Sequence, residues 1–176
     1  MYRHMITASE LSDVPVPERL FAYADAYRNA SSVVCSRIAS DPESHGWPDA
    51  AVVLMLAAHA VELFLKAALL KRFPDEDVWT HGHRLDDLSD TYRARFEEPI
   101  FDWDIPFQQG KYPDEMTEEE VVALRKKRPE PSILYRYPVS KGGTEWIGLY
   151  GFEPNSFLLL LGKVERDFQR IKSQLV

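Results

Sequence analysis

The feature that most constrains the fold is a long apolar segment near the middle of the chain. Residues Asp49–Arg72 are apolar on nearly every side, and Phe73-Pro74 follows them directly. The residue before a proline is disfavoured in the helical conformation, so the helix ends there. Because a helix that is hydrophobic all round must be covered all round, the segment predicts a central helix with other helices packed about it.

Three ionisable residues, His59, Glu62 and Lys66, lie inside this apolar segment. Each charge near a bilayer centre costs roughly 2.5–3.5 kcal/mol on insertion scales, so we reject a membrane span and expect no membrane partner. At about 100° per residue the three share one stripe of the helix, and Glu62 precedes Lys66 in the favourable order for an ion pair. We interpret the stripe as a structural polar seam, completed by His83 if the next helix pairs antiparallel and donates to Glu62.

Three further helices are indicated by the spacing of apolar residues. They cover Glu18–Ala39, about 83–96, and the segment after Pro154, where Asn155 or Ser156 is the expected N-cap. Together with the central helix they predict an all-α fold, an up-and-down four-helix bundle. We find no internal repeat and no linker long enough to divide domains, so residues 1–176 form a single expected domain.

An insertion at about 97–153 separates the last two helices. Thr117-Glu-Glu-Glu120 matches the capping box that opens a helix, so a short helix is expected there. Ile133–Tyr137 and Trp146–Tyr150 alternate around a Gly-Gly turn and predict a small β-hairpin. The insertion is therefore expected to combine one short helix with one hairpin.

Charge and cysteine content limit the class of protein. The chain of 176 residues has 28 Asp and Glu against 21 Lys and Arg, a net charge of −7, so nucleic acid is a possible partner only through a local basic patch. Cys35 is the only cysteine, which excludes intramolecular disulfides and favours a reducing compartment. The first residues lack the apolar core of a signal peptide, so we expect a cytoplasmic protein.

A metal centre is the alternative interpretation of the polar seam. His59-x-x-Glu62 with His81-Gly-His83 offers three or four ligands for zinc or iron. A di-iron bundle normally takes Glu-x-x-His from two helices, and this chain has no second copy. We therefore expect no metal and no cofactor, and a metal-binding bundle enzyme is the third hypothesis for function.

Aromatic and basic residues of the insertion are candidates for ligand or interface contacts. The aromatic candidates are Trp103, Tyr135, Tyr137 and Trp146. Their rings could stack on a base or ligand, or cover one end of the bundle or a dimer interface. The run Arg125-Lys-Lys-Arg128 could contact phosphate, although a basic last turn is also typical of helix ends.

Two motifs resemble the HEPN family of small bacterial helical bundles. His59-Ala-Val-Glu-Leu-Phe-Leu-Lys-Ala-Ala-Leu-Leu70 followed by Gly82-His-Arg-Leu-Asp-Asp-Leu88 is similar to the family's Glu-Leu-x-Leu-Lys-Ala helix and its Gly-His-Asp-Leu-x-x-Leu continuation. Leu134-Tyr-Arg-Tyr-Pro138 is similar to divergent members. The resemblance implies a four-helix bundle that dimerises, with a link to RNA cleavage, nucleotide binding, or toxin–antitoxin and phage-defence systems.

The family's catalytic motif is missing from this chain. Active members carry Arg, four to six residues, then His as a metal-free ribonuclease pair, whereas here all five histidines lie at or before His83. Our leading hypothesis is therefore a non-catalytic module that works as a homodimer and binds a partner protein, such as an operon-encoded nucleotidyltransferase, or a nucleotide or RNA. The alternative is a divergent metal-independent ribonuclease that uses His81, His83 and Arg84.

Overall fold

The computed structural model describes residues 5–108, 116–120, 123, 129–146 and 151–175, and every regular element in these ranges is a helix. This confirms the all-α class. The α-helices are α1 (Val16–Ser40), α2 (Trp47–Arg72), α3 (Leu85–Arg95), α5 (Pro131–Leu134) and α6 (Pro154–Lys172). The 3-10 helices are η1 (Ala8–Leu11), η2 (Pro42–Ser44) and η3 (Pro99–Phe101).

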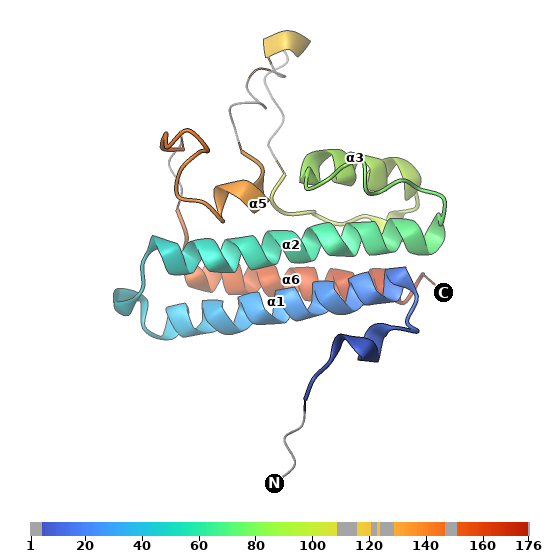
Figure 1. Ribbon diagram of the computed structural model, residues 1–176, viewed down its shortest axis with the longest axis horizontal. Helices are drawn as coiled ribbons and strands as arrows, with labels where there is room; N and C mark the ends of the chain where they lie inside the picture. Colours follow the sequence, from blue (N-terminus) through green and yellow to red (C-terminus); the bar gives the residue numbers. More distant parts are fainter. Residues whose placement is uncertain (1–4, 109–115, 121–122, 124–128, 147–150, 176) are drawn as a thin grey trace.

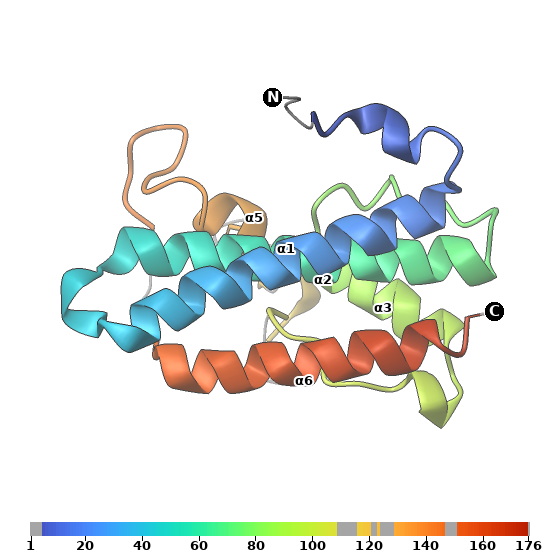
Figure 2. The same cartoon turned by 90° about the horizontal axis from the view of Figure 1, so that it is seen from below.

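The three long helices lie side by side (Figures 1 and 2). Helix α1 runs opposite to α2, to which η2 connects it, and α6 runs alongside them in the direction of α2. Helix α2 is the most deeply buried of the three, and the phenyl ring of Phe64 stacks on that of Phe168 in α6, with their centroids 3.8 Å apart. The apolar segment therefore forms the central helix that its sequence predicts.

Helix α3 does not pair antiparallel with α2. The chain after α2 turns back along it, so that His83 contacts Glu62 near the middle of α2. Helix α3 then begins there and ends near the C-terminus of α2, where the rings of Phe73 and Phe96 lie 5.5 Å apart. The two helices run in the same general direction, and the antiparallel expectation is wrong because residues 73–84 retrace the second half of α2 before α3 starts.

The sequence predicted the N-caps of two helices, and one of these predictions is wrong and the other is confirmed. The N-cap of α6 is Glu153, whose carboxylate accepts hydrogen bonds from the backbone N–H groups of Asn155 at 3.0 Å and Ser156 at 2.6 Å. The expectation of Asn155 or Ser156 as cap is wrong, because Pro154 takes the first helical position, which it favours. The capping box is confirmed, since Glu120 accepts from Thr117 N–H at 2.8 Å.

The predicted hairpin is not confirmed. Its first expected strand begins within α5, because Pro131 starts a turn of helix in which the N–H groups of Ile133 and Leu134 donate to the carbonyl of Glu130, each at 2.8 Å. The described residues retain one isolated antiparallel bridge, between Val139 and Glu145. Most of the second expected strand, 147–150, lies outside the described residues.

Helix α2 is the one described helix that is long and apolar enough to cross a membrane. Its most apolar window is 72% buried inside the protein. Burial of this kind is what a core helix requires, because the helices around it supply the apolar environment.

Candidate functional site

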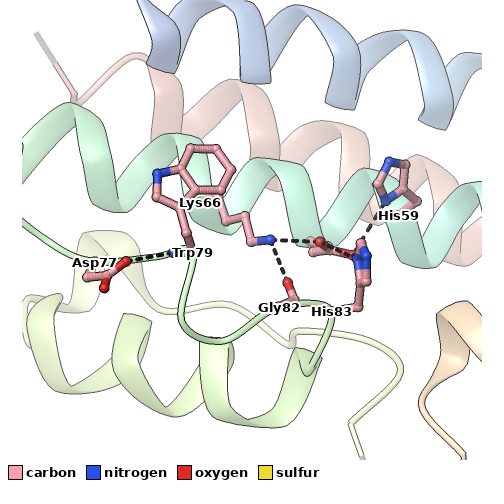
Figure 3. A network of polar contacts seen from close by, with 7 residues as sticks. His59, Lys66, Asp77, Trp79, Gly82 and His83 are labelled. Atoms are coloured by element: carbon pink, nitrogen blue, oxygen red, sulfur yellow. Dashed lines mark hydrogen bonds and ion pairs between the residues drawn. The ribbon is translucent and has the colours of Figure 1, made fainter.

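The polar seam of α2 forms a connected network around Glu62 (Figure 3). The Glu62 side chain is 4% exposed, and its oxygens lie 2.8 Å from Lys66 Nζ, 3.0 and 3.2 Å from His83 Nδ1, and 3.4 Å from His59 Nδ1. The structure thus brings together all four residues of the predicted seam. The contact between Glu62 and His83 is the one that the sequence predicted.

Lys66 connects the network to the segment that folds back along α2. Its ammonium group donates to Glu62 Oε1 and, at 2.6 Å, to the backbone carbonyl of Gly82. Gly82 has a φ of 56°, a conformation that glycine adopts without strain, and this turn presents its carbonyl to the lysine. The indole of Trp79 covers the same ammonium, with its ring centroid 5.5 Å from Nζ.

The network keeps Glu62 ionised. Burial alone would raise the pKa of this carboxyl, but hydrogen bonds from His59 and Lys66, and the charges of Lys66 and His83, outweigh burial and lower the pKa to about 2. At neutral pH Glu62 is therefore a carboxylate with no proton to donate. Three surrounding donors compensate for its removal from water.

The ionised carboxylate determines the tautomers of the two histidines. Because a carboxylate only accepts hydrogen bonds, the Nδ1 atoms of His59 and His83 must carry the protons that they share with Glu62. In a neutral imidazole the other nitrogen, Nε2, is then an acceptor. The His83 side chain is 60% exposed, so solvent reaches this residue although its partner Glu62 is buried.

The other proposed catalytic residues lie outside the network. His81 Nε2 is 3.3 Å from Thr91 Oγ1 in α3, and Arg84 pairs with Asp87 at 3.1 Å. Neither side chain has a described contact with Glu62. Of the three catalytic candidates, His83 is therefore the one that contacts the buried carboxylate.

A narrow recess beside the network contains a serine that the sequence did not single out. It is lined by Glu62, His83 and Ser132, together with Ala58, Leu85 and Pro131. The hydroxyl oxygen of Ser132 is buried without a hydrogen-bond partner. Helix α5 of the insertion thus packs over the seam, a long-range contact that no spacing of residues in the sequence indicates.

The four aromatic candidates occupy different environments. Trp103 is 7% exposed and packs edge-on against Phe64 in the core, so its ring is not open to a ligand from solvent. Tyr135 is half-buried near Phe107, Tyr137 is exposed, and the Trp146 indole N–H donates to the Tyr137 carbonyl at 2.7 Å. The basic run at 125–128 lies outside the described residues.

Sequence reasoning missed two aromatic contacts at the network. Trp79 covers Lys66, and the ring of Tyr27 in α1 lies edge-on to His59 with centroids 4.6 Å apart. Tyr27 lies on another helix than His59, and a contact between two helices could not be deduced from one sequence. Trp79 stands in a turn-rich segment without periodicity, so no pattern marked it.

No group of three or more possible metal ligands occurs among the described residues. Lys66 occupies the position beside Glu62 that a cation would need, and an ammonium held 2.8 Å from the carboxylate competes with any metal there. Comparison of the chain with family models, curated proteins and solved structures finds no match.

Proposed function

We propose that this protein is a non-catalytic, HEPN-like helical module that acts by binding, as a homodimer, to a partner protein or to a nucleotide or RNA. The observation that carries the proposal is how the polar side chains of α2 are used. Glu62 receives three donors, and Lys66 donates one hydrogen bond to Glu62 and one to the Gly82 carbonyl, with a cation–π contact to Trp79. These groups hold the fold together. Recognition of a partner or ligand therefore falls to residues on the surface.

The absence of catalysis is tested by incubating the protein with structured and single-stranded RNA, with and without divalent metal. We expect no cleavage above that of a mock preparation, because the Arg–His pair of active members is missing from the sequence. The same RNAs and a panel of mononucleotides are then tested for binding. Cleavage that disappears in folded His83→Ala protein would replace the binding role with a ribonuclease.

A divergent ribonuclease is the second candidate, and one observation favours it. Glu62 orients the imidazole of His83 so that Nε2 is the acceptor in its neutral form, as a general base requires. The neighbouring Arg84 is 56% exposed and could face a phosphate. The His81→Ala variant separates His81 from His83, since of these two histidines only His83 has a described contact with the Glu62 carboxylate.

The outer face of α1 and α2 supports self-association. Most of its exposed side chains are uncharged, in a chain of net charge −7, and Arg37 near the end of α1 is a charged exception. The uncharged ones are Ala22, Tyr23, Ala26, Ala30 and Val33 in α1 and Val52 in α2. A face with so few charges can meet its own copy across a twofold axis with little repulsion, as an isologous dimer requires. Light scattering is expected to give a dimer, and Val33→Glu is expected to give a monomer with unchanged circular dichroism.

The cellular role follows from the resemblance and is proposed with it. We infer a cytoplasmic protein of a toxin–antitoxin or phage-defence system, whose operon-encoded partner would be a protein such as a nucleotidyltransferase. Co-expression with the products of the neighbouring genes, followed by affinity purification, is the direct test. Failure of every neighbour to co-purify would remove the partner-protein form of the proposal and leave the nucleotide or RNA form.

A further inference from the structure

Trp79 presents a large aromatic ring to solvent on a well-braced turn. The residue is 56% exposed, although Lys66 lies against its ring with Nζ 5.5 Å from the centroid. The turn is held by hydrogen bonds from Gly82 N–H to the Trp79 carbonyl at 3.0 Å, from Lys66 to the Gly82 carbonyl at 2.6 Å, and from Thr80 to the Asp77 carbonyl at 2.8 Å. A ligand that stacks on the indole therefore need not order the turn first.

His83 lies further along the same turn and reaches the same side of α2 as Trp79 (Figure 3). The two rings are linked through Lys66 and Glu62, by contacts of 5.5, 2.8 and 3.0 Å in succession. They are thus close enough for one short single strand to reach both. Since Glu62 holds the proton on Nδ1, the Nε2 atom of neutral His83 offers an acceptor, and its natural counterpart in a ligand is a hydroxyl donor.

We propose that Trp79 and His83 form a binding site for an unpaired ribonucleotide, in which a base stacks on the Trp79 indole and a ribose hydroxyl donates to His83 Nε2. Every base has a π-face that an exposed tryptophan can stack on, and the 2′-hydroxyl is the donor that distinguishes RNA from DNA. The inference rests on the proposed binding function and adds the site and the ligand class. Phosphate contacts are not the basis of this site, because Lys66, the cation beside Trp79, is already paired with Glu62.

The test uses the full chain with UMP, AMP, a short single-stranded RNA and DNA of the same sequence, and measures affinity by calorimetry. Trp79→Ala is expected to weaken binding of the RNA about five- to 150-fold, the range for loss of one stacked base, while Trp79→Phe retains most of the affinity. Trp47→Ala is the matched control, because Trp47 is also an exposed tryptophan, 42% exposed, but lies at the far end of α2. Circular dichroism and the Tm verify that each variant is folded.

The His83→Asn variant tests the role of His83 separately from that of Trp79. Its side-chain amide can still donate to Glu62, but it lacks the Nε2 acceptor. It is expected to reduce the affinity for RNA about two- to tenfold, toward that for DNA, with little change in Tm. Mononucleotide binding that depends on Trp79 would identify a free nucleotide as sufficient, and binding of the oligomer alone would identify a strand.

Three results would overturn the inference. RNA binding that Trp79→Ala leaves unchanged, or that Trp47→Ala weakens equally, removes the site while the binding function stands. Wild-type protein that binds no nucleotide or strand removes both the site and the nucleotide form of the proposed function. Loss of the dimer in Trp79→Ala with unaltered RNA affinity would assign the indole to a protein interface instead.

Discussion

Replacing Lys66 by methionine tests whether the buried network holds the fold together. Methionine keeps most of the volume of the side chain but removes the ammonium that donates to Glu62 and to the Gly82 carbonyl. Glu62 and Lys66 are only 4% and 6% exposed, so water cannot replace the lost partner without rearrangement. Removing one member of a buried ion pair typically costs about 3–5 kcal/mol, and we expect Lys66→Met to lower the free energy of unfolding by that amount.

The expected cost comes from the carboxylate that is left behind, so a second substitution should recover much of it. In Glu62→Leu/Lys66→Met neither charge remains, and replacement of a buried pair by apolar residues is often close to neutral. Urea denaturation at pH 7 of the wild type, both single variants and the double variant gives the coupling free energy, expected at about 2 kcal/mol or more. If Lys66→Met does not fold, a folded double variant provides the same evidence.

Lys71→Met is the matched control for this experiment. Lys71 belongs to the same helix and pairs with Glu18 at 2.7 Å, but these side chains are 33% and 38% exposed. Exposed pairs contribute about 0–1 kcal/mol, so this variant should differ little from the wild type. The reasoning is refuted if Lys66→Met costs no more than Lys71→Met, or if the effects of Lys66→Met and Glu62→Leu simply add.

The remaining predictions concern pH, the core and metal content. The pKa of Glu62 is about 2 in the folded protein against an ordinary value of 4.5, so its contribution of about 3 kcal/mol is complete above pH 4.5 and is lost as the pH falls toward 2. Denaturation curves from pH 7 to 2 should show a shallower loss in Glu62→Gln than in the wild type, and parallel losses would contradict this. Trp103→Ala should cost about 3–5 kcal/mol in the same assay, because the ring is 7% exposed in the core, and a cost below 1 kcal/mol would mean that the site is not packed as described. Elemental analysis after dialysis should find no stoichiometric zinc or iron, and metal that is retained by the wild type but lost in Glu62→Ala would restore the metal hypothesis.

Regular patterns in the sequence determined the helices and the seam. Apolar residues repeat along α1, α2 and α6. Helix α2 ends two residues before Pro74, as predicted, and α6 begins directly after an unexpected cap, Glu153. The geometry of a helix alone places His59, Glu62 and Lys66 on one stripe. A buried carboxylate needs donors, and that requirement predicted His83 as the partner of Glu62.

Only the tertiary structure decided which distant segments meet. Three features depend on a turn-rich segment and on an insertion, neither of which has a periodic pattern of apolar residues. They are the direction of α3, the cover of Trp79 over Lys66, and the packing of Ser132 beside Glu62. In the insertion, local strand propensity at Ile133 gave way to the helix that Pro131 starts. The sequence determined what each helix must bury, because that depends on neighbours a few residues apart, whereas contacts between segments depend on how the whole chain fills its core.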